Sequence, residues 1–453
     1  MKFYGRSTEL NKIGSYWNDV KTGMSKILVI SGRRRIGKTR LALESTQNIP
    51  SLYFFVTRKK VIELLRDWSA QTKKALGNVF FGEFTNMEEF LEFLFDYSKK
   101  NPLSVIFDEF QNFSYTNPEV YSVFQKLFDL KKDRSALLMI ISGSSYSLME
   151  RIFLGKKEPL FGRASEVINL SYLSLADQSR FFDDQGITSQ KEKIFFFSVF
   201  DGVPKYWEEI ASYNDALFTT RLRKLFMGKD WIWEEGENIL REEFGKDYVS
   251  YFSILSAIAK GRRILGEIGQ FAGIKEASVY LKKLEDVYHL IERRIPVTEK
   301  SKADSRKGRY YLRDNFFTFW FAFVESSRYL KEIGQKETAV QDFISNLDTF
   351  SGRMLEKMAI RTMIEENPLG IKFSRIGAYW DRKGEIEIDM MILNDETRDA
   401  YLFEAKLNKN KITPSLMEKL RMKAEKIPGI SGYTIHVGSV YPGNGNLLFD
   451  MEE

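Results

Sequence analysis

The sequence predicts a multidomain α/β protein organised around a P-loop nucleotide-binding core. Three observations predict this class: a chain of 453 residues, a complete phosphate-loop motif near its start, and a distant pair of strands that carry acidic side chains. A chain of this length corresponds to about three or four structural units, more than one hydrophobic core normally serves.

The phosphate loop is the strongest signal in the chain. Residues 32–39 match GxxxxGK[ST], and the apolar run at 26–31 predicts a buried strand before them, with a helix after them from residue 40. The loop N–H groups can then cradle phosphates at a helix N-terminus, Lys38 can neutralise the β and γ oxygens, and Thr39 can reach Mg²⁺. We therefore expect ATP and Mg²⁺ as cofactors. The predicted nucleotide contacts are Gly32, Arg33, Arg34, Arg35, Ile36, Gly37, Lys38, Thr39 and Arg40.

Two further apolar runs predict strands that end in polar residues beside this loop. The run at 103–107 ends in Asp108 and Glu109, and the run at 136–141 ends in Ser142. We predict that Asp108 holds Mg²⁺ through its water shell and that Glu109 polarises the attacking water, because phosphoryl transfer depends on positioning and charge. Ser142 could sense the γ-phosphate.

Composition excludes several other site classes. The chain has no cysteine and two histidines, so thiolate metal sites, disulfides and cysteine nucleophiles are ruled out and any metal must have oxygen ligands. The N-terminus lacks an apolar signal segment, and the most apolar stretch, residues 316–324, is too short to span a bilayer. We expect a soluble, cytoplasmic protein without a membrane partner.

The positive charge is concentrated in one segment. Residues 260–313 contain fourteen Lys or Arg against seven Asp or Glu, so the rest of the chain sums to −1 of the total net charge of +6. This distribution favours a polyanion partner that binds locally, with a solvated basic surface as the alternative.

These motifs together resemble the archaeal-type ATPase family, a branch near the AAA+ and STAND nucleotide switches. The resemblance extends to the F-x-G-R-x-x-E-L box at 3–10, the sensor strand at 141–144, the P-L-x-G-R pattern that ends in Arg163, and the G-x-P turn that ends in Pro204. It implies that Arg163 contacts or relays the γ-phosphate and that the Pro204 turn lies near the nucleotide. A plain surface role for Arg163 stays open.

A helical lid and a winged helix-turn-helix are expected after the ATPase core. Residues 248–287 carry three short helical patterns, and a strand-like segment follows at 289–297. The third helix would be the recognition element, and the basic residues after it would form a wing; packing or dimerisation is the alternative role. His289 is expected to be structural. The side chains expected to reach nucleic acid are Ser278, Tyr280, Lys282, Lys283, Arg293, Arg294, Lys300, Lys302, Arg306, Lys307 and Arg309.

The C-terminal third resembles the PD-(D/E)xK nuclease fold. Strand-like runs at 385–392 and 400–406 carry Asp389 and the pair Glu404 and Lys406, with fourteen residues between the two acids. Period-two alternation puts Glu404 and Lys406 on one face, and strand pairing could bring Asp389 beside them. Two carboxylates could then bind Mg²⁺ while Lys406 orients water or neutralises charge. The resemblance adds Glu356, in a helical stretch upstream, as a further metal ligand.

The predicted architecture is a P-loop AAA+-like ATPase core with a helical lid, a winged helix-turn-helix and a C-terminal α/β restriction-endonuclease-like domain. The expected domains are residues 1–172, 173–246, 247–300 and 301–453. We predict an ATP-binding and ATP-hydrolysing DNA-processing protein with an ATP-regulated, metal-dependent nuclease, in which an oligomer is possible. The alternative is a STAND-like regulatory switch that binds DNA or protein and carries a silent nuclease fold; a small-molecule P-loop kinase is disfavoured.

Overall fold

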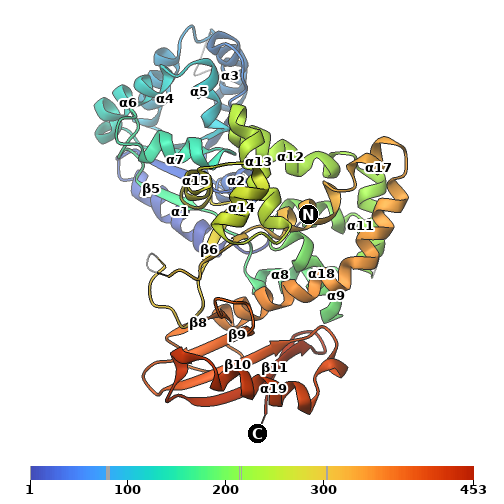
Figure 1. Cartoon of the computed structure of the whole chain (residues 1–453). Helices are drawn as coiled ribbons and strands as arrows, with labels where there is room; N and C mark the ends of the chain where they lie inside the picture. Colours follow the sequence, from blue (N-terminus) through green and yellow to red (C-terminus); the bar gives the residue numbers. More distant parts are fainter. Residues whose placement is uncertain (1, 78–81, 214, 216, 303–304, 453) are drawn as a thin grey trace. The chain divides into compact units, whose positions relative to one another are not determined.

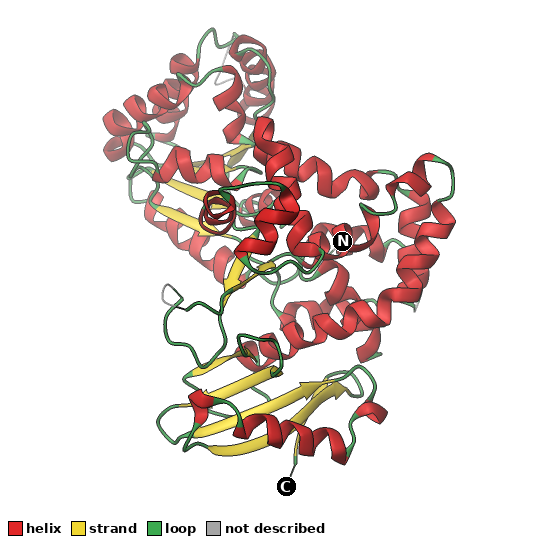
Figure 2. Cartoon of the chain, in the orientation of Figure 1, coloured by secondary structure: helices red, strands yellow, loops and turns green. Residues whose placement is uncertain are grey.

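The computed structural model describes residues 2–77, 82–213, 215, 217–302 and 305–452 (Figure 1), and the chain divides into two compact units. The N-terminal unit comprises residues 5–173 with 203–205. The C-terminal unit comprises the described residues of 1–4, 174–202 and 206–453. Helices and strands alternate in the first unit, whereas helices precede the main sheet in the second (Figure 2).

The N-terminal unit is built on a parallel sheet with strand order β2-β3-β4-β1-β5. The register sets Ile30 opposite Ser142 and Phe107 opposite Ile141, so β1, β3 and β4 end at the same edge. The strands are β1 (Lys26–Ser31), β2 (Ser51–Phe55), β3 (Leu103–Asp108), β4 (Leu137–Ser142) and β5 (Glu166–Asn169).

Helices cover this parallel sheet, and an aromatic core fixes part of their packing. Phe54 and Phe107 on the strands contact Trp68 and Phe90 on the helices, with ring centroids 5.0 to 6.4 Å apart. Burial of these side chains stabilises the strands that carry the candidate site. The helices are α1 (Ser7–Val20), α2 (Lys38–Ser45), α3 (Val61–Leu76), α4 (Met87–Ser98), α5 (Phe113–Thr116), α6 (Val120–Lys131) and α7 (Tyr146–Leu154).

The C-terminal unit begins with a helical region that the later aromatic segment completes. Phe226 contacts Phe319 and Phe343, and Trp320 lies so close to Gly236 that a Cβ there would meet the indole at 2.4 Å. Residues far apart in sequence therefore share one apolar core. The helices are α8 (Leu175–Asp184), α9 (Gln190–Phe200), α10 (Pro204–Ala211), α11 (Phe218–Gly228), α12 (Trp231–Phe244), α16 (Asn315–Phe319), α17 (Arg328–Glu332) and α18 (Lys336–Glu365).

Three helices and a two-stranded hairpin follow one another in the order expected of a winged helix. The hairpin is antiparallel, with Ile291 opposite Leu312 and Arg294 opposite Arg309. Leu281 and Leu284 are fully buried on one face of the third helix. The elements are α13 (Tyr248–Ala259), α14 (Leu265–Ala272), α15 (Ala277–Asp286), β6 (Ile291–Arg294) and β7 (Arg309–Leu312).

The C-terminal sheet is mixed, with strand order β12-β11-β10-β9-β8. The β10–β11 pair is parallel, and the other neighbouring pairs are antiparallel. Helix α18 has 30 residues and is therefore about 45 Å long. Its Phe343 contacts the aromatic core of the helical region, while Leu355 and Met363 pack with the strands. The remaining elements are β8 (Arg375–Trp380), β9 (Glu387–Asn394), β10 (Asp399–Ala405), α19 (Pro414–Glu425), β11 (Thr434–Pro442) and β12 (Leu447–Met451).

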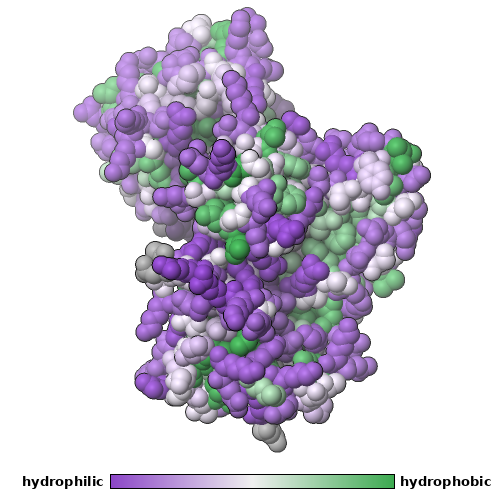
Figure 3. All heavy atoms as spheres, in the orientation of Figure 1, coloured by the Kyte–Doolittle hydropathy of each residue, from purple (hydrophilic) through white to green (hydrophobic). Residues whose placement is uncertain are grey.

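The strands predicted around both candidate sites are confirmed to within two residues at each end. The four-domain division stays a prediction, because the helical region, the winged-helix elements and the C-terminal sheet fall together in one compact unit. Among the described residues, no helix combines the length and apolarity needed to cross a membrane. The face drawn in Figure 3 is largely hydrophilic, with apolar side chains scattered over it.

Candidate functional sites

The phosphate loop adopts the backbone geometry that its glycines allow. Gly32 has φ +147°, and a Cβ there would come 2.8 Å from the Leu170 carbonyl oxygen. Gly37 has φ +95° and immediately precedes α2. Lys38 is buried, and its ammonium donates to the carbonyls of Gly32 and Arg33 at 2.8 Å each. The loop therefore curls around the lysine at the N-terminus of a helix, where N–H groups favour anions.

The other predicted loop contacts differ in exposure. Ile36 is 1% exposed and belongs to the core, while Arg40 is exposed on α2 and forms an ion pair with Glu44 at 3.4 Å. Arg33 lies over the Tyr172 ring at 5.8 Å. The F-x-G-R-x-x-E-L box at 3–10 contacts the phosphate loop through Arg6, which donates to the Ile36 and Ser171 carbonyls.

Asp108 is the centre of a buried hydrogen-bond cluster beside the loop. It is 2% exposed, and it accepts hydrogen bonds from the hydroxyls of Thr39 at 2.6 Å, Ser142 at 2.5 Å and Tyr53 at 3.0 Å. The loop, β3 and β4 thus meet at one carboxylate. Burial, with Asp108 beside it, raises the pKa of Tyr53, which keeps that phenol a donor.

This cluster contains the oxygen donors that Mg²⁺ prefers. The Thr39 hydroxyl and the Asp108 carboxylate lie side by side, next to the bend where phosphates would bind. The donor set therefore fits a magnesium ion, with Thr39 and Asp108 as the residues that would hold it.

Glu109 is oriented by two neighbours. Its carboxylate accepts hydrogen bonds from the Gln111 amide and the Ser144 hydroxyl, each at 2.6 Å. Its backbone lies in the left-handed region at φ 57°, which turns the chain directly after β3. Glu109 is therefore held at the edge where the phosphate loop lies, tied to the polar end of β4.

Pro204 lies beside the phosphate loop, whereas Arg163 does not. A Cβ on Gly37 would be 3.8 Å from the Pro204 ring. Arg163 pairs with Asp129 at 3.0 Å and lines a surface hollow with Lys26, the first residue of β1. The loop follows the opposite end of β1, about 20 Å away for six strand residues. The prediction that Arg163 contacts the γ-phosphate of a nucleotide bound to its own chain is therefore wrong.

The C-terminal acidic residues converge as their strand pattern predicts. The β9–β10 pairs end at Met390 and Phe403, and Asp389 and Glu404 are the next residues beyond that pair on the two strands. The Ala405 N–H donates to Asp389 at 2.9 Å. Lys406 lies 2.5 Å from Glu404 and 3.9 Å from Asp389. The ammonium therefore bridges the two carboxylates.

Glu356 joins this cluster electrostatically. Burial and the nearby Asp389 raise the pKa of Glu356 to about 8, opposed by Arg263 and Lys406. Burial and the nearby Glu404 raise the pKa of Asp389 to about 6. The cluster therefore holds protons more tightly than free carboxylates do.

The predicted three-carboxylate metal site is not formed. Among the described residues, no group of three or more His, Asp or Glu side chains is spaced to hold a metal ion. Glu356 therefore does not join Asp389 and Glu404 in a three-ligand group, and Lys406 compensates the two strand carboxylates. The donor types suit a divalent cation, but the spacing does not form a three-ligand site.

The side chains predicted to reach nucleic acid from the third helix differ in exposure. Ser278, Lys282 and Lys283 are exposed on α15. Tyr280 is half-buried and contacts the buried Tyr251 with ring centroids 5.2 Å apart. Their contact with nucleic acid stays a prediction.

The wing is docked against the C-terminal sheet. Arg309 pairs with Glu387 at 2.6 Å, and Lys307 pairs with Glu299 at 2.7 Å. The Trp380 indole donates to the Lys307 carbonyl, and the Val297 N–H donates to Ala378. Arg293 and Arg294 also make internal contacts, whereas Lys300, Lys302 and Arg306 are exposed. Some of the predicted wing residues therefore make contacts within the protein, and the others are exposed cations.

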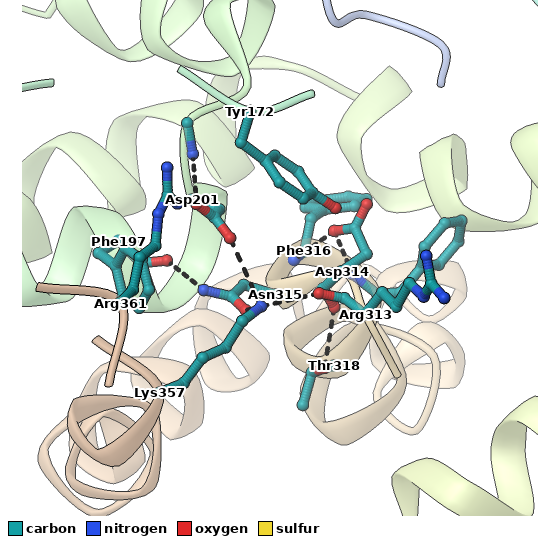
Figure 4. A network of polar contacts seen from close by, with 12 residues as sticks. Tyr172, Phe197, Asp201, Arg313, Asp314, Asn315, Phe316, Thr318, Lys357 and Arg361 are labelled. Atoms are coloured by element: carbon teal, nitrogen blue, oxygen red, sulfur yellow. Dashed lines mark hydrogen bonds and ion pairs between the residues drawn. The ribbon is translucent and has the colours of Figure 1, made fainter. Parts of the chain in front are cut away.

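Sequence reasoning missed a buried charge network next to the Pro204 turn. Asp201, 1% exposed, accepts from Arg361 at 2.6 Å and lies 3.5 Å from Lys357 (Figure 4). Lys357 also donates to the Asn315 amide oxygen at 2.6 Å, and Asn315 donates to the Phe197 carbonyl. Lys357 and Arg361 are one helical turn apart on α18, a spacing that could have pointed to a shared anion.

Comparison with known proteins agrees with this fold. The parallel sheet, the loop and the Asp108 cluster define a P-loop ATPase, and residues 3–210 match the family described as an ATPase domain predominantly from Archaea. Residues 320–420 match a family described as Archaea bacterial proteins of unknown function.

A full-length relative shows the family. The chain is 32% identical over 442 residues to Uncharacterized protein MJECL04 of Methanocaldococcus jannaschii, covering 94% of this chain and 95% of that protein. The chain therefore belongs to the same family as that protein, an archaeal-type ATPase with a C-terminal domain of unknown function.

Solved structures agree at the level of fold. The Walker-type ATPase Paby2304 of Pyrococcus abyssi is 18% identical, with a TM-score of 0.52, over 71% of this chain and 96% of that one. The ORC2 protein of Aeropyrum pernix, in ADPNP–ADP complexes, is 13% identical with a TM-score of 0.46 over 76% and 96%. The second likeness is too low to argue from.

Proposed function

We propose that this ATPase processes nucleic acid, with a metal-dependent phosphodiesterase site in its C-terminal sheet that nucleotide state regulates. The observation that carries the proposal is the meeting of Asp389, Glu404 and Lys406 at one point of the β9–β10 pair. Two carboxylates with an adjacent lysine are the groups that phosphate-ester hydrolysis requires.

In the ATPase half, each residue of the cluster has a defined task. Lys38 neutralises the β and γ oxygens, and Glu109, fixed by Gln111 and Ser144, orients the attacking water. Ser142 would sense the γ-phosphate, and it is linked to Asp108 by a hydrogen bond. Thr39 and Asp108 would hold Mg²⁺, which would supply neutralisation of the charge that develops on the phosphates.

In the C-terminal half, Asp389 and Glu404 would hold a divalent cation, which would supply an activated water. Lys406 would then leave its bridge between the carboxylates to neutralise charge on the phosphate. Without a cation, burial and the nearby Asp389 raise the pKa of Glu356 to about 8, so Glu356 holds a proton near neutral pH until a cation binds.

The Asp201 network supports the regulatory part of the proposal. Asp201 lies three residues before Pro204, which contacts the phosphate loop, and it is ion-paired with the helix that carries Glu356. A nucleotide-dependent shift of the turn would therefore move charges that are fixed to α18. ATP would thereby influence the C-terminal sheet through residues 201–204 and the ion pairs of Asp201 with α18.

One observation favours a second function, a regulatory switch with a silent nuclease fold. The Lys406 ammonium already compensates both strand carboxylates, and no three-ligand metal group exists in the described chain. In that case ATP would control binding of DNA or protein without cleavage.

Arg163 supports an oligomeric form of the ATPase. Because it lies at the opposite end of β1 from its own phosphate loop, it could serve only the nucleotide of a neighbouring copy. The rate of ATP turnover per chain would then rise with protein concentration in the wild type. In Arg163→Ala it would not depend on concentration.

The deciding experiment measures release of labelled fragments from linear and branched DNA with Mg²⁺ or Mn²⁺, with and without ATP. We expect cleavage by the wild type and none by Asp389→Asn, with ATP turnover unchanged. Absence of cleavage in every condition, together with ATP turnover, would select the regulatory switch. Cleavage insensitive to ATP and to Lys38→Ala would remove the regulatory link.

A further inference from the structure

The hairpin of the winged-helix elements places a cationic and aromatic cluster next to the C-terminal acidic site. Tyr311 on β7 is contacted by two guanidinium groups: Arg263 lies 4.4 Å and Arg294 lies 4.5 Å from its ring centre. Arg263 also donates to the Tyr311 hydroxyl at 3.1 Å, and its carbonyl accepts from the Tyr310 N–H at 2.8 Å. Arg263 is therefore fixed to the hairpin although it precedes Tyr311 by 48 residues.

Arg263 differs from the other arginines of the hairpin in its charge balance. Arg294 pairs with Glu292, and Arg309 pairs with Glu387. Within the part of the chain that the structure describes, Arg263 contacts the Tyr311 ring and hydroxyl and forms no ion pair with a carboxylate. A guanidinium in this state retains its capacity for a bidentate anion contact.

The strand geometry brings this cluster to the acidic site. Arg309 holds Glu387, which lies two residues before Asp389 on β9 and therefore no more than about 7 Å from it along the strand. Arg309 lies 5.0 Å from the Trp380 ring, and Trp380 is 6.4 Å from Tyr311.

We propose that Arg263 and Tyr311, supported by Arg309 and Trp380, form the binding wall for a single-stranded nucleic-acid segment at the C-terminal site. Arg263 would bind a backbone phosphate, and a base would stack on the guanidinium and aromatic surface that Arg263, Arg294 and Tyr311 form together. Guanidinium groups beside aromatic rings suit this ligand because each nucleotide offers both a phosphate and a flat base. The inference rests on the proposed function and moves the main nucleic-acid contact from α15 to the hairpin.

The test is binding of a fluorescein-labelled single-stranded 20-mer by anisotropy, in EDTA and without ATP, so that no cleavage occurs. Arg263→Ala should weaken binding by about tenfold and lower the salt slope by about one, as expected for one lost phosphate contact. Arg262→Ala is the matched control, because Arg262 is exposed in the same loop; it should change affinity less than twofold. Tyr311→Leu should also weaken binding, and a duplex of the same sequence should bind less tightly.

Folding is checked by the melting temperature and by ATP turnover, both of which should stay at wild-type values in Arg263→Ala. Equal losses in Arg263→Ala and Arg262→Ala, or no wild-type binding, would overturn the inference. Lys282→Ala on α15 gives a competing readout: a larger loss there than in Arg263→Ala would return the contact to the third helix. Cleavage that depends on Asp389 but not on Arg263 would overturn this inference alone, and binding that depends on Arg263 without any cleavage would overturn only the nuclease part of the proposed function.

Discussion

The two sheets of this protein place their acidic residues in different ways. In the N-terminal unit Asp108 and Glu109 follow the end of a parallel strand, where the ends of β1 and β4 meet it. In the C-terminal unit Asp389 and Glu404 lie just beyond the last residue pair of the antiparallel strands β9 and β10. At the ends of parallel strands, each polar side chain comes from the short motif that ends its own strand. At the C-terminal site, further residues come from other elements, here α18 and the β6–β7 hairpin.

The difference also concerns charge. Asp108 is satisfied by three hydroxyls and a backbone N–H, neutral donors that leave it able to serve a cation. Asp389 and Glu404 are bridged by the Lys406 ammonium. The first site is therefore arranged for an external cation, while the second must first release an internal one.

The largest expected effect separates the two sites by function. Lys38→Ala removes the charge that faces the phosphates, and ATP turnover should fall by at least about 100-fold, the scale for losing one group that stabilises developing charge. Phosphate release measures it, with Lys74→Ala on the exposed face of α3 as the control. Turnover within threefold of wild type would contradict the role of Lys38.

The matching change in the other sheet is Asp389→Asn. Cleavage of DNA should fall by at least about 100-fold, because the charge stabilisation that a bound metal supplies is worth several kcal/mol. ATP turnover should not change, since Asp389 lies in the other unit. If both activities fell together, the two sites could not be treated as separate. Glu396→Gln, in the exposed turn after β9, is the control.

A third prediction concerns the buried ion pairs of Asp201 with Lys357 and Arg361. Asp201→Ala leaves Lys357 and Arg361 without their buried carboxylate, and the free energy of unfolding should fall by about 3 kcal/mol, as for other broken buried ion pairs. Urea denaturation of the C-terminal unit within the full chain measures it. Asp348→Asn breaks an exposed ion pair on the same helix and should cost less than about 1 kcal/mol. Similar losses in both variants would show that Asp201 is not a special anchor.

How far the sequence predicts each site follows from the same difference. The phosphate loop, the three strands and the Asp108 cluster could be predicted because each is a local pattern with a fixed strand-to-loop geometry. The pairing of Asp389 with Glu404 was also predictable from strand alternation. Arg263, Tyr311 and Asp201 were not, because their partners lie 48 to 160 residues away in the chain. The error about Arg163 has the same origin, since no local pattern reveals at which end of β1 it lies.

The smallest expected effect is a pH dependence confined to the C-terminal sheet. The pKa of Glu356 is raised from 4.5 to about 8, so between these values the folded chain binds a proton that the unfolded chain has released. Stability should therefore decrease as pH rises through this range, with Asp389 adding to the slope up to its pKa of about 6. In Glu356→Gln the neutral amide removes the Glu356 contribution, so the drop in melting temperature between pH 5.5 and pH 8.5 should be smaller than in the wild type. Glu418→Gln, exposed on α19, should keep the wild-type drop. Equal drops in all three proteins, measured in EDTA, would show that Glu356 is already ionised in the folded state, and it would then be available as the metal ligand that the sequence resemblance implied.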